Sequence, residues 1–164
     1  MNYHKIEACN LANGTGWRVI LWLSGCSHHC PGCHNPETWD ENSGAKFDIK
    51  AKDLLFDLLN KDYIKGITFT GGDPLHKNNR KEVVELCKQI KEKFQNKDIW
   101  LYTGYTFEEI KTPEILKDID VLVDGPYMQE KRDITIPFRG STNQRIIDVC
   151  ETLNKKEIIL KPVD

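Results

Sequence analysis

Three cysteines, Cys26, Cys30 and Cys33, lie within eight positions of one another in a run that reads C-S-H-H-C-P-G-C-H-N over residues 26–35. Such spacing keeps three thiols close together whatever the local backbone does, so it is suited to a metal, an iron–sulfur cluster or redox exchange. Closed structural zinc sites and ferredoxin clusters use four protein ligands, and no fourth cysteine lies nearby. The run therefore indicates a centre with one coordination position left open.

Three classes of protein compete for this loop. A structural zinc module would recruit His28, His29 or His34 as its fourth ligand. A pure electron carrier needs full ligation by the protein, and the ferredoxin spacing C-x₂-C-x₂-C is not the spacing found here. An enzyme whose 4Fe-4S cluster binds a small molecule at its fourth iron explains the three-cysteine count directly. We favour the enzyme.

Apolar runs that predict buried strands alternate with patterns that predict helices. The predicted strands cover residues 18–24, 66–70, 99–103, 119–123 and 145–149, with a candidate sixth at 157–161. Helices are predicted over residues 48–60 and 79–94, and Thr106 with Glu109 forms a capping box for another. This alternation predicts an α/β fold with a mainly parallel sheet and right-handed crossovers. The cysteines, Gly71 with Gly72, and Asp124 then share the carboxyl edge of the strands, where α/β proteins place active sites.

The length of 164 residues, with 39% hydrophobic and 29% charged residues, predicts a single domain with an ordinary core. A full eight-unit barrel typically needs about 250 residues, which this chain lacks. If the sheet curls, it forms a partial (βα) barrel of five or six units that is open along one side. A laterally open site suits a substrate too large for a closed pocket.

Charge and hydropathy exclude several other classes. A formal charge of −2 offers no electrostatic footprint for nucleic acid, and the longest apolar run, residues 19–23, is far too short to span a membrane. The first five residues have no apolar region typical of a signal peptide. We therefore expect a cytoplasmic protein, in which thiols stay reduced and clustered cysteines bind metal more often than they pair.

Two motifs in order carry a family resemblance. The cysteine spacing, followed after the next strand by Gly71-Gly72-Asp73-Pro74, resembles the radical S-adenosylmethionine superfamily. Asn13-Gly14, Cys-Pro-Gly-Cys-His-Asn, Gly-Gly-Asp-Pro-Leu, Val-Asp-Gly-Pro and Arg-Gly-Ser-x-Asn-Gln together resemble the activating proteins of anaerobic ribonucleoside-triphosphate reductases. The likeness runs from residue 1 to about residue 148. It implies one radical S-adenosylmethionine domain over residues 1–164, with the partial barrel of that superfamily.

The resemblance also implies cofactors, partners and site residues. Cys26, Cys30 and Cys33 would hold a 4Fe-4S cluster, and S-adenosylmethionine would bind its open iron. The methionyl group would lie near Gly71, Gly72 and Asp73, and the adenine near Gly32, Cys33 and His34. An electron from a donor such as reduced flavodoxin would release a 5′-deoxyadenosyl radical, which takes hydrogen from a glycine on the large reductase subunit. An alternative is the activase of another glycyl radical enzyme.

Several roles stay open at this stage. The superfamily usually has an aromatic residue just before the third cysteine, where this chain has Gly32, so the group that packs on the adenine is not assigned. Asp73 suits a helix N-cap ahead of Pro74 as well as a ligand role. Four polar family residues are expected either to bind ribose or carboxylate or to hold the loop that meets the partner, namely Asp124, Arg139, Ser141 and Asn143.

Overall fold

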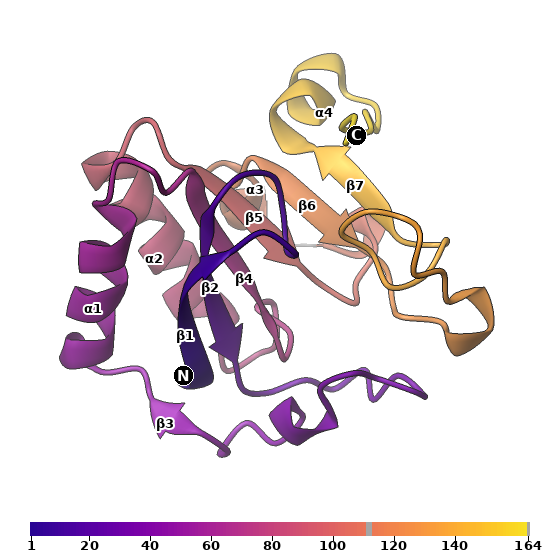
Figure 1. Ribbon diagram of the computed structural model, residues 1–164. Coiled ribbons are helices and arrows are strands. Elements are labelled where there is room, and N and C mark those ends of the chain that lie inside the picture. Colours follow the sequence, from indigo (N-terminus) through magenta and orange to yellow (C-terminus); the bar gives the residue numbers. More distant parts are fainter. Residues whose placement is uncertain (111–112, 164) are drawn as a thin grey trace.

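A seven-stranded open sheet organises the part of the chain that the computed structural model describes, residues 1–110 and 113–163 (Figure 1). Residues 111, 112 and 164 of the expected single domain lie outside the described residues. The strand order is β3-β1-β2-β4-β5-β6-β7. The strands are β1 (Asn2–Asn10), β2 (Arg18–Leu23), β3 (Ala45–Lys46), β4 (Gly66–Gly71), β5 (Asp98–Tyr102), β6 (Val121–Asp124) and β7 (Arg145–Asp148).

The sheet is mixed, so the prediction of a mainly parallel sheet is wrong. Strands β2, β4, β5 and β6 run parallel, whereas β1 is antiparallel to β2 and β3, and β7 is antiparallel to β6. The cause lies in the connections. The short loop between β1 and β2 suits a hairpin, and residues 125–144 join β6 to β7 without the α-helical crossover that usually joins parallel strands.

The longer helices α1 and α2 cover one face of the sheet (Figure 1). The α-helices are α1 (Ile49–Leu59), α2 (Arg80–Lys93), α3 (Pro113–Leu116) and α4 (Val149–Lys155), and the 3₁₀ turns are η1 (Pro36–Thr38), η2 (Phe107–Glu109) and η3 (Gln129–Lys131). The predicted capping box of Thr106 and Glu109 is confirmed, although it opens a single 3₁₀ turn. Residues 157–161 hold an isolated bridge from Leu160 to Ile147 in place of the candidate strand.

The two faces of the sheet bury different cores, because alternate residues of a strand point to opposite faces. On the helix side, Leu21, Phe69 and Leu101 belong to a large core with apolar residues of α1 and α2. On the other side, Trp100 belongs to a smaller core that packs against Phe138. Phe138 lies in residues 126–144, called here the covering loop. Among the described helices, none combines the length and the apolar character needed to cross a lipid bilayer.

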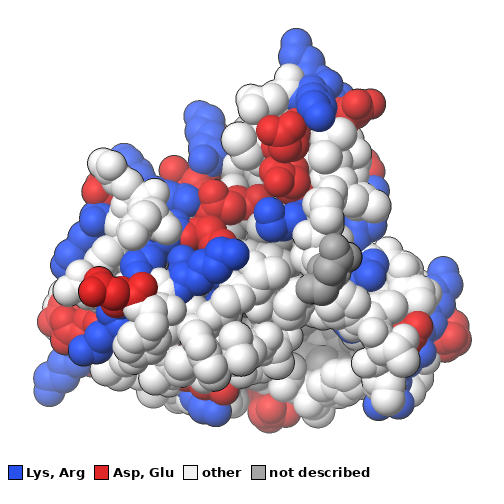
Figure 2. Space-filling model, turned by 45° about the horizontal axis from the view of Figure 1, so that its top comes forward, with Lys and Arg blue, Asp and Glu red and all other residues white. Residues whose placement is uncertain are grey.

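The charged side chains follow no single-sign pattern on the face shown in Figure 2. Lys and Arg are interspersed with Asp and Glu over its upper and outer parts, and the lower central part carries few charges of either sign. This mixed pattern agrees with the formal net charge of −2.

Candidate active site

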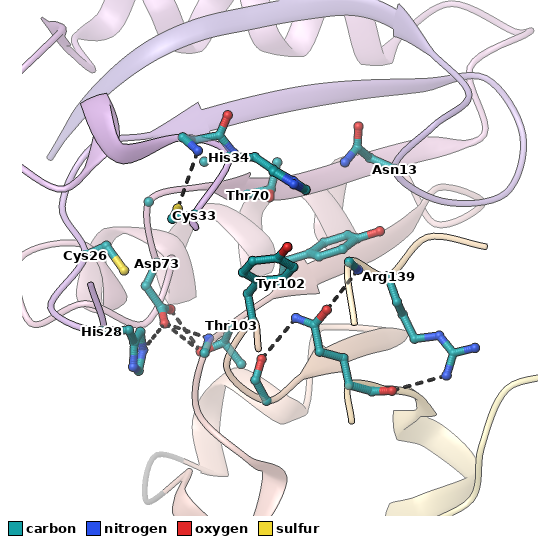
Figure 3. A pocket seen from close by; sticks show the side chains of 18 of the residues that line it. Asn13, Cys26, His28, Cys33, His34, Thr70, Asp73, Tyr102, Thr103 and Arg139 are labelled. Atoms are coloured by element: carbon teal, nitrogen blue, oxygen red, sulfur yellow. Dashed lines mark hydrogen bonds and ion pairs between the residues drawn. The ribbon is translucent and has the colours of Figure 1, made fainter. Parts of the chain in front are cut away.

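A cavity of about 520 Å³ lies at the carboxyl ends of the parallel strands (Figure 3). One part of its wall is the cysteine loop, residues 26–35, which contributes Cys26, Cys33 and His34. Another part is the glycine turn, residues 71–74, which begins at the end of β4 and contributes Gly71, Gly72 and Asp73. The two motifs that are far apart in the sequence thus meet at one cavity.

The end of β2 leads directly into the cysteine loop. The Gly25 N–H donates to the Thr38 carbonyl at 2.7 Å, and the Cys26 N–H donates to the Trp39 carbonyl at 3.1 Å, so η1 holds the start of the loop. All three cysteines are partly buried, and Cys30 is not on the cavity wall. Burial raises the pKa of the Cys26 thiol to about 11, against the opposing effect of the His28 backbone N–H. The free thiol is therefore protonated at neutral pH.

The donor set of the cysteine loop fits an iron–sulfur cluster better than a single ion. Thiolates are soft ligands that suit iron–sulfur clusters as well as zinc. A single zinc ion needs its sulfur ligands about 2.3 Å from the metal. No three His, Cys, Asp or Glu side chains of residues 1–110 and 113–163 are gathered tightly enough to hold one metal ion. The loop therefore presents no ready-made mononuclear site, while Cys26 and Cys33 face a cavity with room for a larger group.

The glycine turn is pressed against the end of β2. A Cβ on Gly71 would lie 2.8 Å from the Leu23 backbone nitrogen, and the φ of +93° at Gly71 suits glycine. A Cβ on Gly72 would lie 2.5 Å from the Gly25 carbonyl oxygen. The fold itself therefore requires both glycines. Their task of presenting bare backbone to a methionyl group stays a prediction, and it would be a second, separate reason for glycine at these positions.

Asp73 is a buried carboxylate on which several donors converge. It accepts hydrogen bonds from the Leu75 N–H at 2.8 Å, from Thr103 Oγ1 at 2.9 Å and from the Gly104 N–H at 3.0 Å. It also pairs with His28 Nε2 at 2.6 Å, and this hydrogen bond raises the pKa of His28. The N-cap of α2 is Asn79, so the N-cap interpretation of Asp73 is wrong. Its oxygens are occupied by the protein's own donors.

The wall predicted to border an adenine contains an aromatic residue that the sequence motifs did not single out. His34 lies at 5.2 Å from the Tyr127 ring, measured between centroids, and both residues line the cavity. Gly32 is not on the wall, and a Cβ there would clash with the side-chain oxygen of Gln129. The aromatic side chain thus comes from the covering loop. Its signal in the sequence is its place directly after the Val-Asp-Gly-Pro motif.

The four polar family residues hold the covering loop and β7. Asp124 is buried, accepts from the Phe107 N–H at 2.7 Å and pairs with Arg145 at 2.5 Å. Ser141 Oγ accepts from the Met128 N–H at 3.1 Å. The Asn143 side chain donates to the Pro126 carbonyl at 2.8 Å.

Arg139 lines the cavity on the side away from Cys26 and Cys33 (Figure 3). Its guanidinium donates to the Gln144 carbonyl at 3.2 Å, which places it among the contacts that hold the covering loop. Of the two alternatives left open by the sequence, these contacts support the holding of the loop.

Gln144 is a further residue that stands in a family motif without an assigned task. Its side-chain oxygen accepts from the N–H groups of Gly140 and Ser141 at 2.9 and 3.1 Å, and its amide donates to the Gly125 carbonyl at 3.1 Å. Gln144 therefore joins the end of the covering loop to the end of β6. The sequence does not indicate this role, because Gln144 stands there simply as a polar residue just before a strand.

Several known proteins resemble this chain over most of its length. Residues 12–147 match the family described as a 4Fe-4S single cluster domain. The anaerobic ribonucleoside-triphosphate reductase-activating protein of Enterobacteria phage T4 is 46% identical over 146 residues, which cover 89% of this chain and 93% of that protein. The protein of the same name from Escherichia coli K12 is 41% identical over 148 residues, which cover 88% of this chain and 96% of that protein. A third protein of this name, from Vibrio cholerae, is 41% identical over 150 residues, which cover 89% of this chain and 97% of that protein. The chain belongs to the family of anaerobic ribonucleoside-triphosphate reductase-activating proteins.

Proposed function

We propose that this protein makes a glycyl radical on an anaerobic ribonucleoside-triphosphate reductase by cleaving S-adenosylmethionine at a 4Fe-4S cluster held by Cys26, Cys30 and Cys33. The observation that carries the proposal is the single cavity whose wall is shared by the cysteine loop and the glycine turn. A reaction between a cluster and a ligand at its open iron needs these two segments side by side. The family of the chain supports the identity of the partner.

Each part of the cavity has a task in this reaction. Cys26, Cys30 and Cys33 would hold the cluster, which would supply one electron and an open iron position for the cleavage of S-adenosylmethionine to methionine and a 5′-deoxyadenosyl radical. Gly71 and Gly72 would present bare backbone to the methionyl group, and Cys33 and His34 would border the adenine, whereas Gly32 is not on the cavity wall. Asp73 orients the glycine turn through its hydrogen bonds. The protein thus supplies binding and orientation, while the cofactors supply the difficult chemistry.

The hydrogen donor is then a glycine on the partner protein. One hydrogen atom of that glycine would be transferred to the 5′-deoxyadenosyl radical, giving 5′-deoxyadenosine and a glycyl radical. The cavity is bordered on one side by the covering loop, and this chain has no further domain among its described residues to close over a small substrate. We propose that the open sheet serves as the partial barrel of the superfamily and that the reductase closes it. Reduced flavodoxin is the electron donor that the superfamily suggests, and the cytoplasm is a compartment in which such thiols stay reduced.

A radical-transfer assay tests this proposal. The reconstituted, reduced protein is mixed anaerobically with S-adenosylmethionine and the reductase, and the products are followed by electron paramagnetic resonance and chromatography. We expect a carbon-centred radical on the reductase, together with 5′-deoxyadenosine and methionine in equal amounts. A reductase whose target glycine is changed to Ala is the matched control and should give no signal.

Four outcomes would redirect the assignment. A signal on the control reductase, or rapid turnover of S-adenosylmethionine driven by a small molecule alone, would contradict the activase function. Radical formation only on a different glycyl radical enzyme would favour the alternative partner. Stoichiometric zinc with no iron chromophore after anaerobic handling would favour a structural zinc module.

A further inference from the structure

His28 makes a contact that joins the cysteine loop to the glycine turn. Its Nε2 lies 2.6 Å from Asp73 Oδ2, and the side chains of His28 and Asp73 are 17% and 2% exposed. Within the described part of the chain, residues 27–33 make one backbone hydrogen bond outside regular structure, from Cys33 to Cys30, and it is local. The middle of the cysteine loop therefore depends on side chains for its attachment to the sheet.

Asp73 is fastened to the chain on both sides of Cys26. Its backbone N–H donates to the Gly25 carbonyl at 2.8 Å, and its carboxylate holds His28, two residues beyond Cys26. Cys26 is thus bracketed by two contacts to one residue of the glycine turn. A shift of the turn would move the thiol, and a shift of the loop would move the turn.

The end of β5 is shaped to receive the imidazole ring. A Cβ on Gly104 would lie 2.5 Å from a carbon of the His28 ring, so this position must be glycine for the ring to lie where it does. The ring also meets the edge of Tyr105, with 4.6 Å between centroids. The Thr103 hydroxyl and the Gly104 N–H hold the Asp73 carboxylate in place from the same strand end. A solvent-facing loop histidine would need none of these features.

We infer that His28 is a positioning residue that locks the cysteine loop to the glycine turn through Asp73, so that the cluster site and the S-adenosylmethionine site form one rigid unit. As far as it concerns the cofactors, this inference rests on the function proposed above, whereas the lock itself is a property of the polypeptide. Because His28 Nε2 is engaged by Asp73, His28 acts on the cluster through the position of Cys26 and its neighbouring N–H groups. Hydrogen bonds to cluster sulfurs help to set the reduction potential.

The lock is tested first in the protein without cofactors, by hydrogen–deuterium exchange of the hydrogen-bonded amides next to the contact, those of Cys26, Cys33 and Asp73. His28→Leu removes the donor to Asp73, and we expect exchange to accelerate at least about tenfold, as for the loss of a hydrogen bond to a charged group. His28→Gln retains an N–H donor and should recover most of the protection. Ser27→Ala is the matched control, because Ser27 is an exposed residue of the same loop next to His28.

Gly104→Ala provides an independent route to the same defect. It leaves His28 and Asp73 unchanged but forces the ring away, so we expect faster exchange at the same three amides. In the reconstituted proteins, His28→Leu and Gly104→Ala should bind S-adenosylmethionine about tenfold or more weakly, in the range found when groups that orient metal ligands are removed. The midpoint potential of the cluster should become more negative in His28→Leu, because the N–H groups near Cys26 are less well held.

Unchanged exchange, affinity and potential in His28→Leu would overturn the inference. An equal effect of Ser27→Ala would also overturn it, because the loop would then be sensitive to any substitution. Failure of the proposed function looks different. If the unsubstituted protein takes up iron but does not bind S-adenosylmethionine, the function is wrong, while the exchange experiment still decides whether the lock exists.

Discussion

At the scale of single residues, Asp73 determines how the cavity is held together. Its carboxylate receives donors from the cysteine loop, from its own turn and from the end of β5. A buried carboxylate is costly unless its oxygens are well satisfied, and here the surrounding donors satisfy it. The residue therefore connects three chain segments, one of which is the proposed binding turn.

Asp73→Asn tests this role of the carboxylate. The amide removes the charge and places an N–H₂ group against N–H donors, so we expect the free energy of unfolding to fall by about 2–3 kcal/mol. Urea unfolding of the cofactor-free protein under anaerobic conditions measures this change. Asp53→Asn on the exposed face of α1 is the control and should stay within about 0.5 kcal/mol. Equal stabilities for the two variants would contradict the role of Asp73.

The sequence indicates which residues carry the chemistry of the site better than it indicates the contacts that hold those residues in place. The three cysteines and the glycine turn could be predicted because their spacing is short and their residue types are unusual. The contact between His28 and Asp73 could not, because it joins positions 45 apart in the chain. The places of Tyr127 and Gln144 on the cavity wall were not predictable either, because only the folded covering loop brings these residues there.

At the scale of elements, the covering loop is held by a few side chains and contains a single 3₁₀ turn. Gln144 makes three hydrogen bonds that join the end of this loop to the end of β6. A segment without long helices or strands depends on such contacts. The order of the wall that carries Tyr127 therefore depends on the attachment at Gln144, together with the contacts of Ser141 and Asn143.

Gln144→Ala should loosen this wall. Three hydrogen bonds at about 1 kcal/mol each are lost, so we expect amide exchange in residues 126–143 to rise at least about tenfold. Gln89→Ala on the surface of α2 removes one exposed hydrogen bond to Glu85 and serves as the control. Protection of residues 126–143 that is equal in both variants would show that other contacts hold the loop.

Strand β2 is joined to its neighbours by a buried arginine, a residue that the apolar pattern placed in a strand without a role. Arg18 is fully buried, pairs with Asp98 at 2.6 Å, donates to Thr68 at 2.9 Å and lies over the Trp100 ring at 5.4 Å. The partners stand on β4 and β5. The guanidinium thus connects three parallel strands at the edge opposite to the cavity.

Arg18→Met leaves Asp98 without its partner, and we expect a loss of about 3 kcal/mol in the free energy of unfolding. The double variant Arg18→Met/Asp98→Asn should recover part of that loss, because the uncompensated charge is gone. Chemical denaturation of the single and double variants gives the coupling. Strictly additive effects would show that the pair contributes no interaction of its own.

The strand positions were predictable where burial imposes a continuous apolar run, as in β2, β4 and β6. Strand β1 was missed because its residues are exposed or only partly buried, so they carry no continuous apolar signal. The direction of β7 was also not predictable. It depends on the covering loop returning without an α-helix, and composition alone does not reveal that path.

At the scale of the whole molecule, the six cysteines fall into three environments. Cys9 and Cys150 are exposed, the three cysteines of the cysteine loop are partly buried, and Cys87 is buried in the helix-side core. Burial raises the pKa of the Cys87 thiol well above its usual range. A neutral, enclosed thiol reacts slowly with alkylating reagents.

Alkylation under anaerobic conditions should therefore distinguish the cysteines of the three environments by their rates of labelling. With the cluster bound, we expect rapid labelling of Cys9 and Cys150 alone. The folded protein without cluster should also label in the cysteine loop, and Cys87 should react only after unfolding. Mass spectrometry of the labelled peptides gives the result. Protection of Cys150 by iron, or rapid labelling of Cys87 in the folded protein, would contradict this distribution.

The lock between His28 and Asp73 has a consequence for protein synthesis. The cysteine loop leaves the ribosome before the glycine turn and well before Gly104, which shapes the seat of the His28 ring. At about 5–20 residues per second, translation from residue 28 to residue 104 takes roughly 4–15 s. During that interval the three thiols are present, but the contact that holds the middle of their loop to the sheet has not formed. Iron delivered in that interval would meet three thiols on a loop that is not yet fixed. Productive insertion of the cluster should therefore follow the emergence of β5, and it should require that iron and sulfide remain available until the chain has folded.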